Sequence, residues 1–142
     1  MGKGRVVAAG FDNGIVRVLM FTADGIQLLR SFKAHDDAIS GMKYSSDLKM
    51  FVTASVTGDI FFFLTDPLDL HKYDPLCTVK LPNSAGVNDF KWSPSEESLY
   101  FGCNTGFVYE IKRPIASQID NADSFLWETP DMKTWRIKIM EF

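Results

Sequence analysis

The chain has 142 residues, of which 46% are hydrophobic, 13% aromatic and 23% charged, and its formal net charge is −3. Because this acidic chain has no cluster of Lys and Arg, nucleic acid is excluded as an expected partner. Membrane insertion is excluded as well, because no apolar stretch approaches the roughly 20 residues of a spanning helix. The two cysteines, Cys77 and Cys103, form no CxxC motif, and we expect free buried thiols.

Three segments repeat one pattern along the chain, at residues 6–19, 50–63 and 99–111. Each is an apolar run, a tight turn that ends in glycine, and a second apolar run. The turn glycines are 44 and then 48 residues apart. A period in the forties built from strand–turn–strand units is typical of a β-propeller blade. The three turn glycines are Gly14, Gly58 and Gly106.

A second repeat has the same period. Residues 39–46 align with residues 87–94 at an offset of 48, and residues 139–142 match residues 41–44 once more. One unit then has four expected strands, which gives it the make-up of one antiparallel propeller blade. In the middle unit these expected strands are residues 39–44, 51–55, 60–64 and 76–81.

Local composition supports the all-β interpretation. Residues 60–64 are apolar on both faces, which favours a strand covered on both sides, as in stacked blades. Asn13-Gly14 favours a tight hairpin in which both residues have positive φ. All six prolines, at positions 67, 75, 82, 94, 114 and 130, are expected between strands, because proline cannot donate to a sheet ladder. Residues 65–75 and 112–134 show no clear pattern and are expected as long connections.

We therefore expect one partial propeller of about three four-stranded blades over residues 1–142. The expected boundaries are unit 1 at about 1–32, unit 2 at about 33–81, unit 3 at about 82–134, and the start of a further blade at 135–142. Three blades cannot close a ring, because each repeat buries its faces only against its neighbours. The open faces and edges imply a longer parent chain or a partner that covers them.

The residues that carry a family resemblance are Ala34-His35, the segment 39–45 and the segment 53–60. They resemble the WD40 repeat, and the resemblance extends over about residues 6–142. It implies a propeller of roughly four to eight blades. Within that family, residues 10–18 and the triplet Phe61-Phe62-Phe63 resemble the large WD-repeat proteins of cilia and flagella.

The sequence departs from the WD40 pattern at several positions. The family's Gly-His is Ala34-His35, and its network of His, Ser/Thr, Asp and Trp is expected to be incomplete in every unit. The tight-turn Asp is replaced by Asn13, Thr57 and Thr105, and the signature Trp by Leu19, Phe63 and Ile111. The resemblance therefore implies blades that depend on aromatic packing, with His35, the three turn glycines, Phe63 and Trp92 as structural residues.

The resemblance places two sets of loops on one rim of the propeller, where partner proteins would bind. These loops are small, polar and acidic, so a basic or peptide-like partner surface is expected. The candidate partner-binding residues are Asp12, Asn13, Asp36, Asp37, Thr57, Asn83 and Asn104.

No catalytic, cofactor or metal site is predicted. Neither a nucleophile elbow, nor a P-loop, nor a dinucleotide fingerprint occurs, and no His/Cys cluster or EF-hand spacing is present. His35 lacks the fixed acid or nucleophile that catalysis would need. Glu96-Glu97 is interpreted as a solvated turn, and the paired aspartates as turn formers.

Three functions remain open from the sequence. The ciliary resemblance implies a non-catalytic scaffold of the axoneme that positions or regulates dynein motors, with tubulin-doublet or dynein-associated proteins as partners. A second hypothesis is a cytoplasmic WD40 adaptor in trafficking or ubiquitin ligation. A third is the propeller domain of an enzyme. One fold hosts many functions, so the fold alone does not decide among them.

Overall fold

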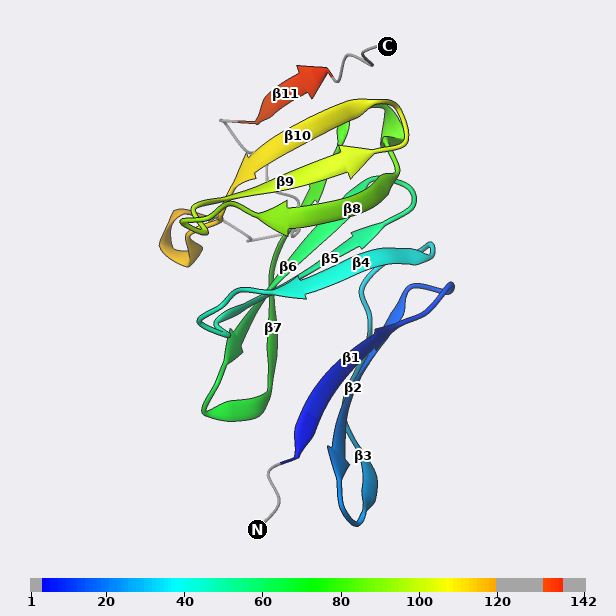
Figure 1. Cartoon of the computed structure of the whole chain (residues 1–142), viewed down its shortest axis with the longest axis vertical. Coiled ribbons are helices and arrows are strands. Elements are labelled where there is room, and N and C mark those ends of the chain that lie inside the picture. The colour runs from blue at the N-terminus through cyan, green and yellow to red at the C-terminus, as the bar shows by residue number, and fades with distance from the viewer. Residues whose placement is uncertain (1–3, 120–131, 137–142) are drawn as a thin grey trace, which may run out of the picture.

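The computed structural model describes residues 4–119 and 132–136, and in this part the chain forms three antiparallel sheets that stack face to face (Figure 1). We call them blades 1, 2 and 3 in chain order. Blade 1 contains β1 (Arg5–Gly10), β2 (Ile15–Thr22) and β3 (Gly25–Lys33). Blade 2 contains β4 (Ile39–Tyr44), β5 (Met50–Ser55), β6 (Asp59–Asp66) and β7 (Asp69–Lys80). Blade 3 contains β8 (Val87–Trp92), β9 (Ser98–Cys103), β10 (Phe107–Lys112) and β11 (Lys133–Arg136).

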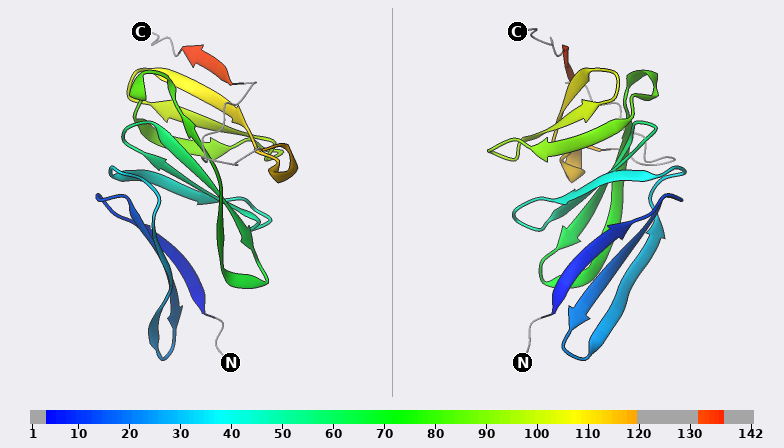
Figure 2. Two further views of the ribbon diagram at one scale, coloured as in Figure 1. Left: turned by 180° about the vertical axis from the view of Figure 1, so that it is seen from behind. Right: turned by 45° about the vertical axis from the view of Figure 1, so that its right-hand side comes forward.

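Each sheet is a meander in which neighbours in sequence are neighbours in space. Two short 3₁₀ helices, η1 (Pro82–Ser84) and η2 (Ala116–Gln118), lie in the connections. In the described part of the chain, no helix is long and apolar enough to cross a bilayer. The views of Figure 2 show the three sheets layered along the long axis of the molecule, with blade 2 in the middle.

The core consists of two clusters, one in each gap between neighbouring blades. Between blades 1 and 2, Phe32 packs on Phe63 with ring centroids 4.9 Å apart, and Phe51 meets Tyr73 at 5.6 Å. Between blades 2 and 3, the second cluster gathers residues of both sheets, among them the buried Phe62 and Phe90. Blade 2 is therefore buried on both faces, which explains why the run at residues 60–64 does not alternate.

Close contact between blades 2 and 3 requires a residue without a side chain at position 41. A Cβ on Gly41 would lie 2.9 Å from the ring of Phe90, so β4 and β8 can approach only because this residue is glycine. Phe63 stands where the WD40 pattern has Trp and is 3% exposed. Its ring packs on Phe61 at 4.6 Å as well as on Phe32.

The turn chemistry differs from the prediction at Asn13. In each of the three repeated turns only the glycine has positive φ: 83° at Gly14, 86° at Gly58 and 85° at Gly106. The glycine N–H donates to the carbonyl three residues earlier, as in a type I turn followed by one left-handed residue. The prediction of positive φ at Asn13 was therefore wrong, and the geometry explains why only the glycine recurs.

The expected loop at residues 65–75 was also wrong. β6 continues to Asp66 and β7 begins at Asp69, so this segment is a hairpin, with Leu64 opposite Asp74. Pro75 lies inside β7, opposite Phe63, where the pairing register shifts. Proline is tolerated there because β7 is the edge strand of its sheet and can leave one ladder position without a donor.

The outermost strand of blade 3 extends beyond the expected end of unit 3 at about residue 134. Lys133–Arg136 pairs with β10, so residues 135 and 136 belong to blade 3 and not to a further blade. Blade 1 has three strands in the described part of the chain, whereas blades 2 and 3 have four each. The segments 120–131 and 137–142, and with them the predicted start of a further blade at residues 139–142, lie outside the described residues.

Candidate functional site

Two loops that join neighbouring blades and three turns within the blades lie along one end of the sheets and form a continuous surface, which we call the loop rim. It comprises residues 11–14, 34–38, 56–58, 81–86 and 104–106, and these turns lie along the right-hand side of Figure 1. Each loop between two blades is hydrogen-bonded to the turn of the preceding blade and to the turn of the following blade. The rim is therefore one connected feature, although its loops lie up to 95 residues apart in the chain.

Backbone hydrogen bonds connect the rim from blade to blade. The Ala34 N–H donates to the Gly14 carbonyl at 2.9 Å, and the Leu81 N–H donates to the Gly58 carbonyl at 2.9 Å. The other side of each loop is fixed as well, because Val56 donates to Ala38 at 3.1 Å. Since these donors and acceptors are main-chain groups, the rim keeps its shape largely independently of its side chains.

The structure brings all seven candidate partner-binding residues to this rim. Six are exposed and Thr57 is half-buried. Among these candidates, most of the exposed groups near blades 1 and 2 are carboxylates from two adjacent loops, and the exposed groups near blade 3 are amides. The exposed six are Asp12, Asn13, Asp36, Asp37, Asn83 and Asn104. Their role in partner binding stays a prediction, whereas their shared location follows from the loops that carry them.

His35 lies beneath the rim and is buried. Its Nε2 lies 2.7 Å from the hydroxyl of Thr53 on β5, and its backbone N–H donates to Gly14 at 3.2 Å. Burial lowers the pKa of the imidazole, and the carboxylates of Asp59 and Asp36 only partly oppose this shift. The neutral ring therefore joins the loop between blades 1 and 2 to the centre of blade 2.

The polar side chains beneath the rim form two separate hydrogen-bonded groups. His35 and Thr53 form the first part. Thr57, which replaces the family's Asp, belongs to the second part, because its hydroxyl lies 3.0 Å from that of Ser55 and donates to Asp59 at 3.4 Å. Ser55 Oγ in turn accepts the N–H of Asp59 at 3.2 Å. Phe63 stands at the Trp position and contributes ring packing instead of an indole N–H.

A hollow of about 270 Å³ lies beside the rim, on its outer side. Two ammonium groups and two carboxylates line it, which are those of Lys33, Lys80, Asp36 and Asp59. Among the described residues, no group of three or more His, Cys, Asp or Glu side chains is arranged to hold a metal ion. The chemistry that the rim offers is therefore hydrogen bonding and charge.

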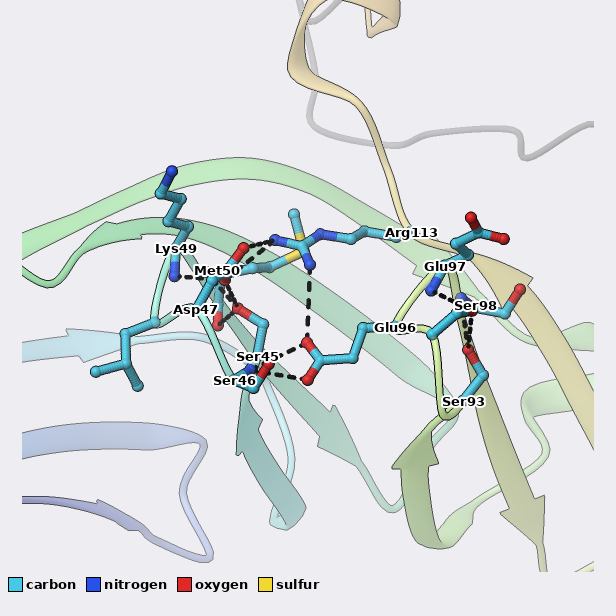
Figure 3. A network of polar contacts seen from close by, with 12 residues as sticks. Ser45, Ser46, Asp47, Lys49, Met50, Ser93, Glu96, Glu97, Ser98 and Arg113 are labelled. Carbon is cyan, nitrogen blue, oxygen red and sulfur yellow. Dashed lines mark hydrogen bonds and ion pairs between the residues drawn. The ribbon is translucent and has the colours of Figure 1, made fainter.

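The opposite end of the sheets contains a side-chain network that sequence reasoning missed (Figure 3). Arg113 follows β10 and reaches the turn of blade 2, where its Nη2 lies 3.3 Å from Asp47. Its Nη1 lies 3.9 Å from Glu96. The guanidinium also lies 5.3 Å above the ring of Trp92. Arg113 thus connects the β4–β5 turn of blade 2 with the β8–β9 turn of blade 3.

Glu96 was interpreted as part of a solvated turn, and the structure corrects this. Both of its carboxylate oxygens lie 3.0 Å from the backbone N–H of Ser46, in the neighbouring blade. The pKa of Asp47 is held below its ordinary range, first by the Ser45 hydroxyl, then by the Lys49 N–H, and less by Arg113. Asp47 and Arg113 lie 66 residues apart, so no local pattern marks their pairing.

Comparison with known proteins now identifies the repeat. Residues 26–63, which extend from β3 into β6, match the family described as "WD domain, G-beta repeat". The chain contains a WD40 repeat. The structure is also similar to the β-propeller domain of Cps50 (Swd1) from Myceliophteria thermophila, with a TM-score of 0.65 at 14% identity. That match covers 76% of this chain and 34% of that chain, so the fold is that of part of a β-propeller.

Two curated relatives cover most of the WD40-type chain. It is 25% identical over 145 residues to cilia- and flagella-associated protein 44 of Mus musculus, and 28% identical over 139 residues to the protein of that name from Chlamydomonas reinhardtii. Each match covers 89% of this chain, which spans only 8% of the length of either relative. The sequence phrases at residues 10–18 and 61–63 resembled the cilia- and flagella-associated protein 43 and 44 pair, and both of these relatives carry the name of protein 44.

Proposed function

We propose that this WD40-type chain is a non-catalytic protein-interaction part of a larger ciliary or flagellar protein. In this proposal it acts in the axoneme and helps position or regulate dynein motors through tubulin-doublet or dynein-associated partners. The names of the two relatives support the ciliary location, and their length supports a larger parent. The observation that carries the interaction role is the loop rim, because its hydrogen-bonded backbone presents exposed side chains from three blades.

The partner surface proposed for the rim is basic. Asp36 and Asp37 are adjacent and exposed, and their loop is hydrogen-bonded to the turn that carries the exposed Asp12. Opposite charges across an interface raise the association rate and determine which partners are accepted, more than they raise affinity. A partner that binds this rim would therefore present Lys or Arg side chains and would associate more slowly at high salt.

We further propose that the parent chain covers the outer face of blade 1. Val16 and Val18 point into the gap with blade 2 and are fully buried, whereas Ile26 and Leu28 are 64% and 55% exposed. Moreover, β5 and β9 each have an inner neighbour, while within the described residues no strand lies beside the inner edge of β1. A preceding blade would cover the face, as blade 1 does for blade 2, and a further strand paired with β1 would cover the edge, as β4 does for β5.

The first experiment is to tag the full-length parent protein in a ciliated cell, extract with detergent, and follow its retention on axonemes with increasing salt. Retention through moderate salt is the expected result. Loss into the detergent-soluble fraction would reject the axonemal role and leave a cytoplasmic WD40 adaptor in trafficking or ubiquitin ligation. A propeller attached to an enzyme would instead be indicated by a Gly-x-Ser-x-Gly segment elsewhere in the parent sequence.

The same assay tests the rim through a matched pair of variants. The rim variant combines Asp36→Lys with Asp37→Lys, and the control combines Asp24→Lys with Glu97→Lys. The control changes the net charge equally but lies at the opposite end of the sheets, on exposed turns. The rim variant is expected to leave the axoneme at lower salt than the control. Equal retention of both variants would contradict a partner on the rim.

A further inference from the structure

A small apolar hollow lies between blades 1 and 2, at the end of the sheets opposite the loop rim. Its volume is about 230 Å³, and its floor is formed by Val6 of β1, Tyr44 of β4 and Tyr73 of β7. This is less than the roughly 300–1,000 Å³ of a typical small-molecule site. The hollow therefore has room for one or two protein side chains rather than for a cofactor.

The two hydroxyls in the floor of the hollow are hydrogen-bonded to each other. The hydroxyls of Tyr44 and Tyr73 lie 2.5 Å apart, so each is the hydrogen-bond partner of the other. The ring of Phe51 packs on both tyrosines from below, at 4.6 Å and 5.6 Å between centroids. A buried apolar surface whose hydroxyls already have partners favours an apolar ligand group.

Two exposed leucines form the entrance. Leu48, in the β4–β5 turn, and Leu70, in the β6–β7 hairpin, both line the hollow and are 48% and 41% exposed. Leu48 also has φ 58°, the left-handed conformation that disfavours a branched side chain. The equivalent residue of blade 3, 48 positions later, is the polar Glu96, with φ 59°. The left-handed φ therefore belongs to the turn that both blades share, whereas the exposed apolar side chain is particular to blade 2.

The charged groups beside the entrance are mainly carboxylates. Asp66 and Asp69 flank the hairpin turn, and each uses one oxygen to accept a backbone N–H two residues later, at 2.9 and 3.0 Å. Lys72 is the cation among the lining residues, and its Nζ lies 3.9 Å from Asp74. The ammonium is thus already paired with a carboxylate outside the lining, and the two aspartates leave the entrance negative.

We propose that this hollow binds a protein segment that inserts one apolar side chain, such as Leu, flanked by Lys or Arg. The apolar side chain would lie on the tyrosine floor between Leu48 and Leu70, and the flanking cations would face Asp66 and Asp69. The inference deepens the proposed scaffold function, since it gives the chain a second contact surface that is separate from the loop rim. Protein interfaces commonly combine a central apolar anchor with a polar border of this kind.

The test uses the full 142-residue chain, with methyl and aromatic NMR signals as the readout. The probes are acetyl-Lys-Leu-Lys-amide and acetyl-Glu-Leu-Glu-amide, which differ only in the sign of the flanking charges. The basic peptide is expected to shift the Leu48, Leu70 and Tyr73 signals in a saturable manner. The acidic peptide is expected to bind about tenfold more weakly. Equal affinity for the two peptides, or no saturable shift with either, would overturn the proposal.

Two leucine variants give the structural control. Leu48→Asn removes the apolar entrance but suits positive φ, so the variant is expected to fold and to bind the basic peptide about tenfold more weakly. Leu68→Asn is the matched control, because Leu68 lies at the same end, is 93% exposed and does not line the hollow. Similar losses in both variants, or unchanged binding by Leu48→Asn, would contradict the proposed site.

The rim variant of Asp36 and Asp37 separates this inference from the proposed function. It is expected to bind the basic peptide as the unchanged chain does, because the peptide docks at the other end of the sheets. A loss of peptide binding in that variant would place the peptide on the rim and overturn the hollow as its site. Peptide binding that persists while the parent protein fails to stay on axonemes would reject the ciliary role alone.

Discussion

The three turn glycines form an internal series in which the backbone is constant and the surroundings vary. Gly14, Gly58 and Gly106 have φ values within 3° of each other, so replacement by Ala carries the same backbone strain in each turn. A new Cβ at Gly106 would meet nothing within 4 Å. At Gly58 it would lie 2.8 Å from the carbonyl oxygen of Ala85, and at Gly14 it would collide with the carbonyl of His35.

These surroundings give an order of destabilisation. Gly106→Ala should lose about 1–2 kcal/mol of unfolding free energy, which is the cost of a left-handed L-residue. Gly58→Ala should lose a further ~1–3 kcal/mol, because the backbone at Ala85 must move. Gly14→Ala should lose the most, because moving the His35 carbonyl also disturbs two hydrogen bonds that the Gly14 carbonyl accepts, each worth ~0.5–1.5 kcal/mol.

The assay is thermal and urea unfolding of the 142-residue chain and the three variants under the same conditions. For a chain of this size, 1 kcal/mol corresponds to about 2–4 °C in Tm. Gly106→Ala should therefore melt only a few degrees below the unchanged chain, with Gly58→Ala clearly lower and Gly14→Ala the lowest. If Gly106→Ala were as destabilised as Gly58→Ala, the contact between neighbouring blades would not be the source of the difference, and the reasoning would be refuted.

Three further predictions concern single side chains. Burial lowers the pKa of His35 in the folded state, so the unfolded state binds the proton more tightly. The free energy of unfolding should therefore be constant above about pH 6.5 and fall below it. In urea titrations, a His35→Asn variant should lose less unfolding free energy per pH unit below that value. Arg113→Met should lose at most about 1 kcal/mol in low-salt unfolding experiments, and the loss should shrink at about 1 M NaCl, whereas a salt-independent loss would assign the effect to packing. Burial raises the pKa of Cys77 to about 12 and that of Cys103 to about 11, so alkylation by iodoacetamide at neutral pH should be slow in the folded chain and fast in urea; equal rates would contradict their burial.

The repeat period determined most of the fold in advance. Strands expected at residues 51–55 and 60–64 occur as β5 (Met50–Ser55) and β6 (Asp59–Asp66), because both are apolar runs bounded by the same glycine turn. The loop rim could be expected as well, because the resemblance to a propeller implies that these two sets of loops lie on one side. Backbone hydrogen bonds between blades then fix their positions, and these bonds do not depend on side-chain identity.

The parts that sequence reasoning missed lack a local signal. The first seven residues of β7, at positions 69–75, are mostly polar and end in Pro75, so they show neither alternation nor an apolar run. β11 has only four residues, all exposed, and an edge strand of that length can be recognised only by its partner. Arg113 is one of several surface cations in the sequence, and its contacts with Asp47 and Glu96 depend on how blades 2 and 3 stack.

Different interactions thus hold the loops at the two ends of the sheets. This difference determines at which end a side chain can change without a change in the shape of the binding surface. At the loop rim, main-chain hydrogen bonds hold the loops, so side chains such as Asp36 can change without loss of shape. At the opposite end, the turns are joined by side chains, including Arg113 and Glu96, and the β6–β7 hairpin carries Leu70 beside an apolar hollow. A substitution there changes both the shape and the chemistry of the surface. The rim therefore suits partners that are recognised by their charge, whereas the hollow suits a partner that must fit a particular shape.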